Sequence, residues 1–228
     1  NGRIFTFSKK KPALQLYMLA HLRRVGLSLN RQIRSHIAFN SNDRMSSTCG
    51  LDTDIVWMDL EMTGLDIEKD KILEVACIIT DQDLNVKSEG PCFAINHPQE
   101  VYDSMNEWCM KHHYNSGLID RCKSSDVNLE EASNLVLSYL EKNIPKRACP
   151  LGGNSVYTDR LFIMKFMPLV DAYLHYRIVD VSTIKELAKR WHPAILDSAP
   201  KKSFTHRSLD DIRESIKELA YYKANLFK

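Results

Sequence analysis

Hydrophobic and polar positions along the chain predict three strands in its first structured part. Apolar segments rich in β-branched residues span residues 54–62, 71–81 and 90–97, and short polar segments separate them. Closely spaced segments of this kind are typical of strands joined by short loops. The pattern therefore predicts an antiparallel meander of three strands.

Helical and strand patterns alternate in the rest of the chain. Apolar residues recur at helical spacing over residues 103–113, 129–143, 159–174, 183–191 and 208–227, and short apolar segments at 148–155 and 176–182 are typical of strands. Thr158 is predicted to cap the third of these helices, and Pro168 is predicted to break it. Strands followed by alternating helices and strands predict an α/β fold, in which a mixed central sheet is flanked by helices.

Charge divides the chain into two parts. Residues 1–44 carry nine basic residues and one acid, a net charge of +8, whereas residues 45–228 carry 22 basic and 28 acidic residues, a net charge of −6. The first part is rich in Arg, and residues 18–39 could form an amphipathic basic helix. These features are typical of a mitochondrial transit peptide, and a disordered basic tail is the alternative. We therefore expect a targeting or disordered segment over residues 1–44 and a folded domain over residues 45–228.

Location and redox state follow from the same features. A transit peptide would bring the chain to the mitochondrial matrix, and a form that starts at Met45 would lack the signal and stay in the cytosol. No run of about 18 apolar residues occurs, so we expect no membrane-spanning helix. The six cysteines form no Cys-x-x-Cys pair, which predicts free thiols. Zinc is a weaker alternative, because Cys109 and the adjacent His112 and His113 have no second pair at ligand spacing.

The first predicted strand ends in two carboxylates, Asp59 and Glu61, with Leu60 between them. Residues i and i+2 of a strand project to the same face, so the two acids converge while Leu60 turns into the core. Two carboxylates held close in a cleft raise each other's pKa or attract a cation, and hard oxygen ligands suit Mg²⁺ or Mn²⁺. The alternative is a solvated strand end with ordinary surface acids.

Three further residues could complete a catalytic site. Asp159 and Asp211 each lie at the start of a predicted helix, and His206 lies in the loop before the last helix. Taken singly, each acid could simply complement a helix dipole, and His206 could be an ordinary loop residue. Together, the four carboxylates could hold two divalent ions about 3.5–4 Å apart across a scissile phosphate. His206 could then take the proton from the attacking water.

Four segments together resemble the oligoribonuclease family, 3′→5′ exoribonucleases of the DEDDh branch. They are "DLEMTGLD", "GNS" followed by Asp159, "YRIVDVSTIKEL" and "HRSLDDIRESIKELAYY", and the resemblance covers residues 54–228. It implies an RNase H-like exonuclease fold, two Mg²⁺ or Mn²⁺ ions, and hydrolysis of short single-stranded oligoribonucleotides, dinucleotides above all, to 5′-mononucleotides. With its basic leader, the chain resembles the mitochondrial eukaryotic members.

The resemblance assigns roles to the residues named above. The acidic metal ligands of the family match Asp59, Glu61, Asp159 and Asp211, and its general base matches His206. Asp210 is adjacent to Asp211, and helix phase alone does not separate the two. The family spacing favours Asp211. Ser208 stands where the family usually has Ala, a small change with no expected effect.

The resemblance also implies how the substrate is held. Two side chains contact the bases, one lies at the scissile end, three cap the 5′ phosphate, and one reaches the site of the neighbouring protomer in a homodimer. In that order they are Leu65 and Trp108, His113, Ser155, Arg177 and Ser182, and Tyr176. From the residues alone, Trp108 could equally belong to the core of a helix, and Tyr176 and Arg177 could be the ordinary start of a strand.

Charge also bears on the substrate class. A protein that binds long nucleic acid usually has a basic face, and the −6 of residues 45–228 argues against one. A DNA exonuclease of the same fold is an alternative, because nothing in the sequence shows a contact with the ribose 2′-hydroxyl. A catalytically silent nucleic-acid-binding module is the alternative from another class. Such a module would be expected to have lost a metal ligand or the base, and all five residues are present.

Overall fold

A computed structural model of the chain describes residues 53–201 and 207–227. The predictions for the basic segment 1–44, for a start at Met45 and for His206 lie outside these residues. Within the described ranges, no helix is long and apolar enough to cross a membrane. The five cysteines in the same ranges are free thiols, as predicted.

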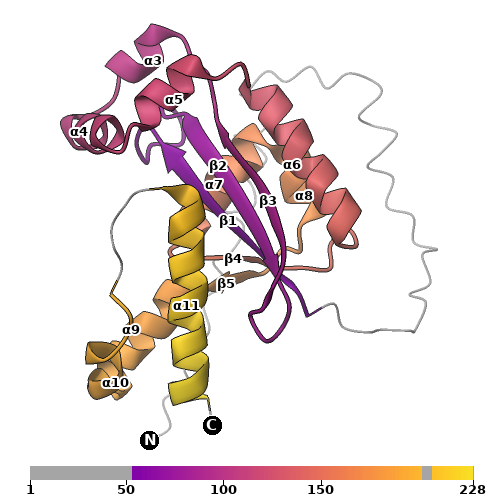
Figure 1. The fold of residues 1–228 in the computed structure, drawn as a ribbon, viewed down its shortest axis with the longest axis vertical. Helices are drawn as coiled ribbons and strands as arrows, with labels where there is room; N and C mark the ends of the chain where they lie inside the picture. The colour runs from indigo at the N-terminus through magenta and orange to yellow at the C-terminus, as the bar shows by residue number, and fades with distance from the viewer. Residues whose placement is uncertain (1–52, 202–206, 228) are drawn as a thin grey trace, which may run out of the picture. The chain divides into compact units, whose positions relative to one another are not determined.

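Five strands form one mixed sheet in the order β3-β2-β1-β4-β5 (Figure 1). The strands are β1 (Ile55–Met62), β2 (Ile72–Thr80), β3 (Val86–Ala94), β4 (Leu151–Gly153) and β5 (Ile178–Asp180). β1, β2 and β3 pair antiparallel, which confirms the predicted meander, and β4 and β5 run parallel to β1. Because β1, β4 and β5 point the same way, their carboxyl ends lie at one edge of the sheet.

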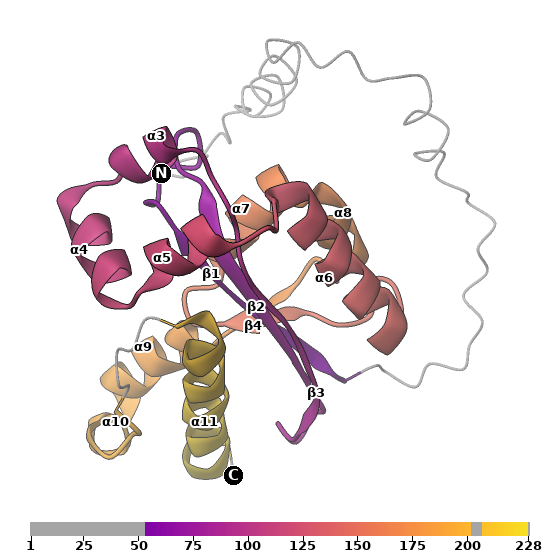
Figure 2. The same cartoon turned by 45° about the horizontal axis from the view of Figure 1, so that its top comes forward.

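Helices lie on both faces of the sheet. Those of the described ranges are α3 (Gln99–Asp103), α4 (Glu107–Asn115), α5 (Leu118–Ser124), α6 (Leu129–Asn143), α7 (Tyr157–Phe166), α8 (Pro168–Tyr173), α9 (Val181–Trp191), α10 (Pro193–Asp197) and α11 (Ser208–Leu226). α6, α7 and α8 cover one face, and α9, α10 and α11 lie on the other (Figure 2). α3, α4 and α5 pack around Leu73 of β2 in a third apolar cluster.

The two-residue period of β1 decides which side chains face which layer. Met58 and Leu60 are buried in the core with α6, α7 and α8, whereas Trp57 is buried in the core with α11. Asp59 and Glu61 follow Trp57 at two-residue spacing, so they face the side of the sheet that α11 covers. The predicted convergence of the two acids therefore takes place between the sheet and α11.

Two predicted helix boundaries are wrong. Residues 103–113 are not one helix, because α3 ends at Asp103 and a new helix, α4, starts after Asn106. The Asn106 side chain accepts a hydrogen bond from the backbone N–H of Cys109 at 2.9 Å and so caps α4. Thr158 is not an N-cap either, since it lies inside the first turn of α7 and Val156 precedes the helix.

Other elements match the pattern or differ in length. α6 spans residues 129–143 as predicted, and Pro168 separates α7 from α8 as predicted. β3 starts at Val86, four residues before the predicted strand, and β4 and β5 are only three residues long. Strands this short depend on pairing with their neighbours more than on their own apolar pattern. The short helices α5 and α10 were not predicted.

Candidate active site

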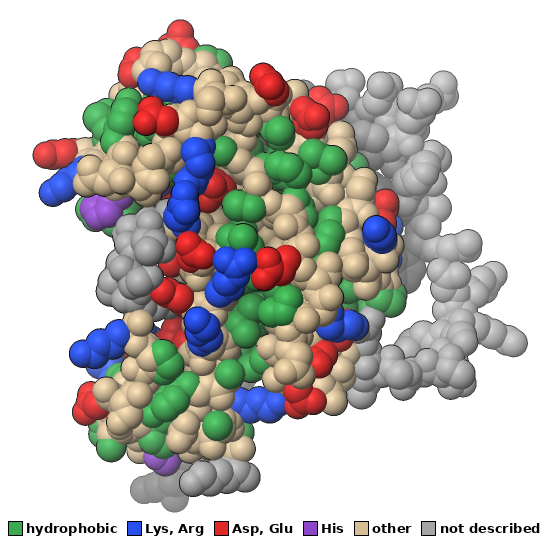
Figure 3. All heavy atoms as spheres, in the orientation of Figure 1, with side chains coloured by type: hydrophobic (Ala, Val, Ile, Leu, Met, Phe, Trp, Pro, Cys, Tyr) green, Lys and Arg blue, Asp and Glu red, His purple; other side chains and the backbone are tan. Residues whose placement is uncertain are grey.

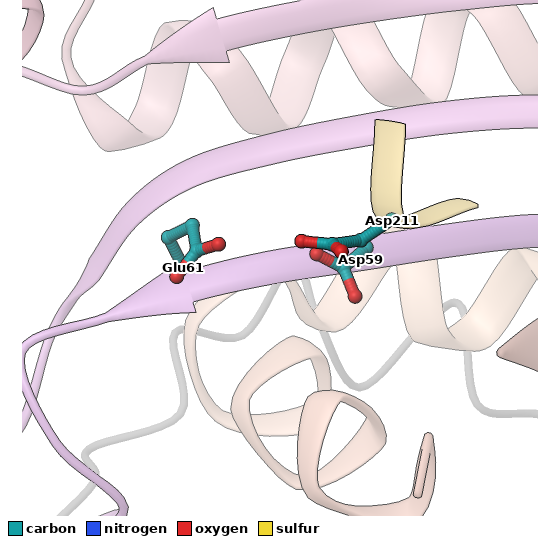
Figure 4. A group of neighbouring side chains, drawn as sticks. All are labelled: Asp59, Glu61 and Asp211. Atoms are coloured by element: carbon teal, nitrogen blue, oxygen red, sulfur yellow. The ribbon is translucent and has the colours of Figure 1, made fainter. Parts of the chain in front are cut away.

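Three carboxylates converge at the end of β1. Asp59 and Glu61 project from β1, and Asp211 projects from the first turn of α11. One carboxylate oxygen of each lies within 4.8 Å of the others. Figure 4 shows the Asp211 side chain beside Asp59, with Glu61 nearer to the end of the strand. An all-oxygen group at these distances could hold a divalent cation.

Electrostatics of the group support this interpretation. The pKa of Glu61 is raised from 4.5 to about 8, mainly because burial removes the carboxylate from water, and next because of the nearby charge of Asp211. Glu74 and Asp159 add smaller effects in the same direction. Carboxylates that raise each other's pKa are stabilised in their charged form by a cation. The donor set, all carboxylate oxygens, therefore fits Mg²⁺ or Mn²⁺.

Asp159 lies beside this group but outside the three carboxylates. It sits in the first turn of α7, and its Oδ1 accepts a hydrogen bond from the backbone N–H of Leu60 at 3.0 Å. Leu60 separates Asp59 from Glu61, so this bond anchors Asp159 at the middle of the site. Burial raises the pKa of Asp159 from 3.8 to about 7.

The structure separates the two neighbouring acids that start α11. Asp211 belongs to the carboxylate group, whereas Asp210 pairs with Arg213, with Oδ1 and Nη1 3.1 Å apart. Asp210 thus points toward a cation on its own helix. His206, the predicted general base, lies outside the described residues.

A cleft of about 470 Å³ adjoins Glu61 and brings together three of the predicted substrate residues. Its lining includes Leu65, Trp108 and His113. Leu65 is 76% exposed and Trp108 is 59% exposed, so both present apolar surface to a ligand. The exposure of Trp108 contradicts the alternative that it is a helix core residue. A base could therefore contact both side chains in this cleft.

His113 directs its Nδ1 toward Glu61. Its Nε2 lies 2.8 Å from the carbonyl oxygen of Met62, and a carbonyl only accepts, so Nε2 donates. In the neutral ring the proton is then on Nε2, and Nδ1 carries a lone pair. Nδ1 lies 3.9 Å from Oε2 of Glu61. A ligand hydroxyl near Glu61 could donate to this nitrogen.

Asp70, which the sequence pattern did not single out, shapes the turn that carries Leu65. Its Oδ1 accepts from the Thr63 hydroxyl at 2.8 Å, and its Oδ2 accepts from the backbone N–H of Asp66 at 2.7 Å. A Cβ on Gly64 would lie 2.5 Å from Oδ2 of Asp70. The Thr-Gly pair after the two acids is therefore explained by the packing of this carboxylate. In the sequence, the signal that could have identified Asp70 was its position across a turn from Thr63 and Gly64.

Two predicted phosphate-binding hydroxyls lie side by side at the carboxyl ends of β4 and β5. The Ser155 hydroxyl donates to the Ser182 hydroxyl at 3.2 Å, and Ser182 donates to Oδ1 of Asn154 at 3.1 Å. The backbone N–H groups of Ser155 and Ser182 both donate to Oδ1 of Asp180 at 2.9 Å. Asp180 thereby draws the two loops together. Ser155 has a left-handed backbone, with φ of 51°, which turns the chain into α7.

Tyr176 and Arg177 precede β5 and do not line the cleft beside Glu61. Tyr176 is 74% exposed, and the Arg177 guanidinium lies 5.4 Å from the centre of its ring. The pair is therefore presented outward from the sheet. Within the described chain, the predicted substrate residues lie in three places: the cleft, the carboxyl ends of β4 and β5, and the amino end of β5.

Solved structures share this fold. Exonuclease I of Methylocaldum szegediense matches with a TM-score of 0.58 at 14% identity, and E. coli exonuclease I in complex with an oligonucleotide matches with a TM-score of 0.60 at 16% identity. Each match covers 77% of this chain and 41% of the exonuclease I chain, so this chain spans about two-fifths of their length. The likeness confirms the predicted RNase H-like exonuclease fold.

Relatives at higher identity define the family. Residues 56–219 match the RNase T family, whose description is exonuclease. The mitochondrial oligoribonuclease of Homo sapiens is 54% identical over 174 residues, which are 76% of this chain and 73% of that protein. The oligoribonuclease of Vibrio campbellii is 49% identical over 177 residues, 78% of this chain and 97% of that protein. With half of its positions shared over most of these proteins, the chain belongs to the oligoribonuclease family of exonucleases.

Proposed function

We propose that the chain is a metal-dependent 3′→5′ exoribonuclease that splits short oligoribonucleotides, dinucleotides above all, into 5′-mononucleotides. The observation that carries this proposal is the carboxylate group of Asp59, Glu61 and Asp211 beside a cleft with an exposed Trp108. Relatives named oligoribonuclease, 49–55% identical to the chain, favour RNA over DNA as the substrate.

Four carboxylates are proposed to hold two Mg²⁺ or Mn²⁺ ions. They are Asp59, Glu61, Asp159 and Asp211. Bound divalent ions supply positive charge that stabilises the developing charge of the phosphate and of the leaving oxygen. The chain contributes the orientation of the carboxylates and their exclusion from water, which the raised pKa of Glu61 reflects. His206, five residues before Asp211, is proposed to accept the proton of the attacking water.

The cleft residues are proposed to position the last two nucleotides. Leu65 would lie between the two bases, and Trp108 would stack on one of them, a contact worth about 1–3 kcal/mol. In the neutral tautomer, Nδ1 of His113 would accept a hydrogen bond from a hydroxyl at the scissile end. Together these contacts would hold the scissile phosphate next to the carboxylates.

The serine pair is proposed to limit substrate length. The hydroxyls of Ser155 and Ser182, with Arg177, would bind the 5′ phosphate of a dinucleotide. A site that binds the 5′ phosphate of a dinucleotide leaves no room for further nucleotides on the 5′ side, so it would favour dinucleotides. The net charge of −6 over residues 45–228 agrees with a substrate that has few phosphates.

A homodimer is proposed to complete the site, with Tyr176 reaching the partner's substrate. An apolar stripe on α7 supports this, because Tyr157, Leu161 and Met164 recur at helical spacing and are 60%, 45% and 53% exposed. Leu169 of α8 is 60% exposed as well. Exposed apolar residues at this density are typical of a protein interface.

The first 44 residues are proposed to direct the chain, whose catalytic domain would span residues 45–228, to the mitochondrial matrix. The relatives from Homo sapiens, Bos taurus and Mus musculus are named mitochondrial oligoribonucleases. A form that starts at Met45 would be cytosolic. Fluorescent fusions with and without residues 1–44 test this, and identical distribution of the two would contradict it.

The activity is tested with a chain-length series of 5′-labelled RNAs, from dinucleotide to heptanucleotide, and matching DNAs, in Mg²⁺ or Mn²⁺. We expect dinucleotides to be split fastest, ribose to be preferred over deoxyribose, and longer chains to shorten from the 3′ end. Survival of the dinucleotides, or an unchanged rate in the Asp59→Ala variant, would overturn the proposal.

A further inference from the structure

A fifth carboxylate lies buried beside the site, although it does not belong to the group of Asp59, Glu61 and Asp211. Glu74, in β2, pairs directly with Glu61 in the β1–β2 register and is 3% exposed. Residues opposite each other in an antiparallel pair project to the same face, so Glu74 also faces α11. A buried acid needs partners, and those of Glu74 indicate its role.

Both oxygens of Glu74 are engaged by protein donors. Oε1 accepts from Nη2 of Arg121 at 2.6 Å, and Oε2 accepts from the backbone N–H of Ser208 at 3.3 Å. Arg121 comes from α5, and Ser208 is the first residue of α11. Arg121 offsets the charge of Glu74, and its hydrogen bond to Oε1 orients the carboxylate toward α11.

The residue before α11 does not cap the helix with its side chain. Within the part of the chain that the structure describes, Arg207 directly precedes the helix, and no side-chain capping hydrogen bond forms at this position. The first backbone N–H groups of a helix have no partner within the helix, and an acceptor that satisfies one of them fixes the first turn. Glu74 supplies this acceptor from a strand 134 residues earlier in the chain. Ser208 is fully buried, so water does not take the place of Glu74 as the acceptor for its N–H.

The first turn of α11 also carries Asp211. The backbone N–H of Asp211 donates to the carbonyl of Arg207 at 2.9 Å, so Asp211 moves with the residues that Glu74 holds. We propose that Glu74 is a positioning residue: it caps α11 from β2 and so sets the Asp211 carboxylate at the metal site. This inference rests on the proposed function, because it assigns Asp211 to metal binding.

Two exposed ion pairs between α11 and the rest of the chain lie farther along the helix. Arg213 pairs with Glu89 of β3 at 2.9 Å, and Lys223 pairs with Asp83 at 2.7 Å. Figure 3 shows acidic and basic side chains interspersed on the face that carries α11. The side chains of both pairs are 41% to 61% exposed, and exposed pairs contribute little to position or stability. Glu89 is therefore a matched control for Glu74.

Glutamine at position 74 cannot replace the carboxylate. A Gln side chain has one acceptor oxygen, whereas two donors, from Arg121 and Ser208, point at Glu74. One donor would face the amide NH₂, so either the hydrogen bond from Ser208 or that from Arg121 would be lost. The first turn of α11 would then be less well fixed, and Asp211 with it.

The test measures Mn²⁺ binding to the full chain by isothermal titration calorimetry, with dinucleotide hydrolysis as a second readout. For Glu74→Gln we expect the Kd of Mn²⁺ to rise about 10- to 100-fold, as for partners that orient a metal ligand. The Mn²⁺ concentration for half-maximal hydrolysis should rise with it, and excess Mn²⁺ should recover most of kcat. Glu89→Gln should leave both values at those of the wild type.

The outcomes separate the inference from the proposed function. A Glu74→Gln variant with a lower Tm but an unchanged Kd for Mn²⁺ would overturn the inference and leave the proposed function standing. A wild-type chain that binds Mn²⁺ without splitting RNA would overturn the proposed function instead. Should the Gln variant fail to fold, Glu74→Asp carries the same test, because it keeps the charge but withdraws it from Ser208. An unchanged Kd in that variant would also overturn the inference.

Discussion

The backbone N–H of Leu60 donates a hydrogen bond to Oδ1 of Asp159 at 3.0 Å, across 99 residues of sequence. β4 pairs with β1 at Val56 and Trp57 and ends at Gly153. Beyond that point the first turn of α7 supplies the acceptor that a longer strand would have supplied. The acid is thereby held at the strand between Asp59 and Glu61.

This contact predicts that charge and hydrogen bonding at position 159 are separable. Asp159→Asn keeps an acceptor for Leu60, so its Tm should stay at or above that of the wild type, because a buried charge is removed. Its rate of dinucleotide hydrolysis should fall by more than about 100-fold. Residues that only hydrogen-bond to a metal ligand typically cost up to that much, and Asp159 is proposed to be a ligand itself. Thermal unfolding and rate assays measure the two effects.

Asp159→Ala is the matched variant, since it removes both charge and acceptor. It should also lower the free energy of unfolding by about 1–3 kcal/mol, because the buried N–H of Leu60 loses its partner. Equal stability of the Asn and Ala variants would contradict the role of the bond.

The raised pKa of Glu61 predicts how stability depends on pH in the absence of metal. The unfolded carboxyl loses its proton near pH 4.5, whereas the folded one keeps it until about pH 8. The folded chain therefore binds more protons in this window, and its free energy of unfolding falls as pH rises from 4.5 to about 8. We expect the Tm measured in EDTA to decrease over this range.

Two comparisons check the origin of that decrease. Glu61→Gln cannot ionise and should reduce the slope, leaving the part that comes from Asp159, whose pKa is also raised, to about 7. Mg²⁺ should flatten it as well, because a cation offsets the charge that appears at high pH. A wild-type Tm that rises between pH 5 and 8 in EDTA would be inconsistent with a buried, raised-pKa Glu61.

The two acids at the start of α11 offer a direct contrast. Asp211 belongs to the carboxylate group, and Asp210 pairs with Arg213. Asp211→Asn should lower the hydrolysis rate by more than about 100-fold and weaken Mn²⁺ binding. Asp210→Asn loses an exposed ion pair and should leave both nearly unchanged. Comparable losses in the two variants would show that the site is assigned to the wrong residue.

The exposed Trp108 predicts a specific loss of substrate binding. Trp108→Ala should raise the KM for dinucleotide about 5- to 150-fold, the equivalent of 1–3 kcal/mol of stacking. Its Tm should change little, because the ring is 59% exposed. Trp191→Ala is the control, since Trp191 is 66% exposed on α9 and does not line the cleft. Steady-state kinetics that show the same KM for both variants would exclude stacking on Trp108.

The turn that carries Leu65 should respond to Gly64→Ala. The new Cβ would displace Asp70 from Thr63 and Asp66, so the turn should shift and KM should rise by about tenfold, the equivalent of one lost hydrogen bond. Gly117→Ala provides the contrast. The new Cβ would meet no atom within 4 Å, but alanine is strained at the left-handed φ of 70°. Gly117→Ala should therefore lower Tm without changing KM. A normal KM in Gly64→Ala would mean that the turn does not place Leu65.

Local pattern in the sequence determined the long elements and the first half of the site. Residues 129–143 repeat apolar positions at helical spacing and form α6 over that range. The strand period placed Asp59 and Glu61 on one face, because a two-residue repeat needs no knowledge of neighbours. Family resemblance favoured Asp211 over Asp210 and added Trp108 and the other substrate residues, which lie on separate elements.

Tertiary structure alone decided the contacts that complete the site. The family spacing favoured Asp211, but only the fold shows that Asp211, and not Asp210, reaches β1. The roles of Asp70 and Glu74 depend on which donors meet them. The hydrogen bonds of Asp159 and Glu74 to the backbone span 99 and 134 residues, and no local period encodes a partner so distant. A side chain's neighbours along the chain determine its face, whereas the packing of whole elements determines its partner.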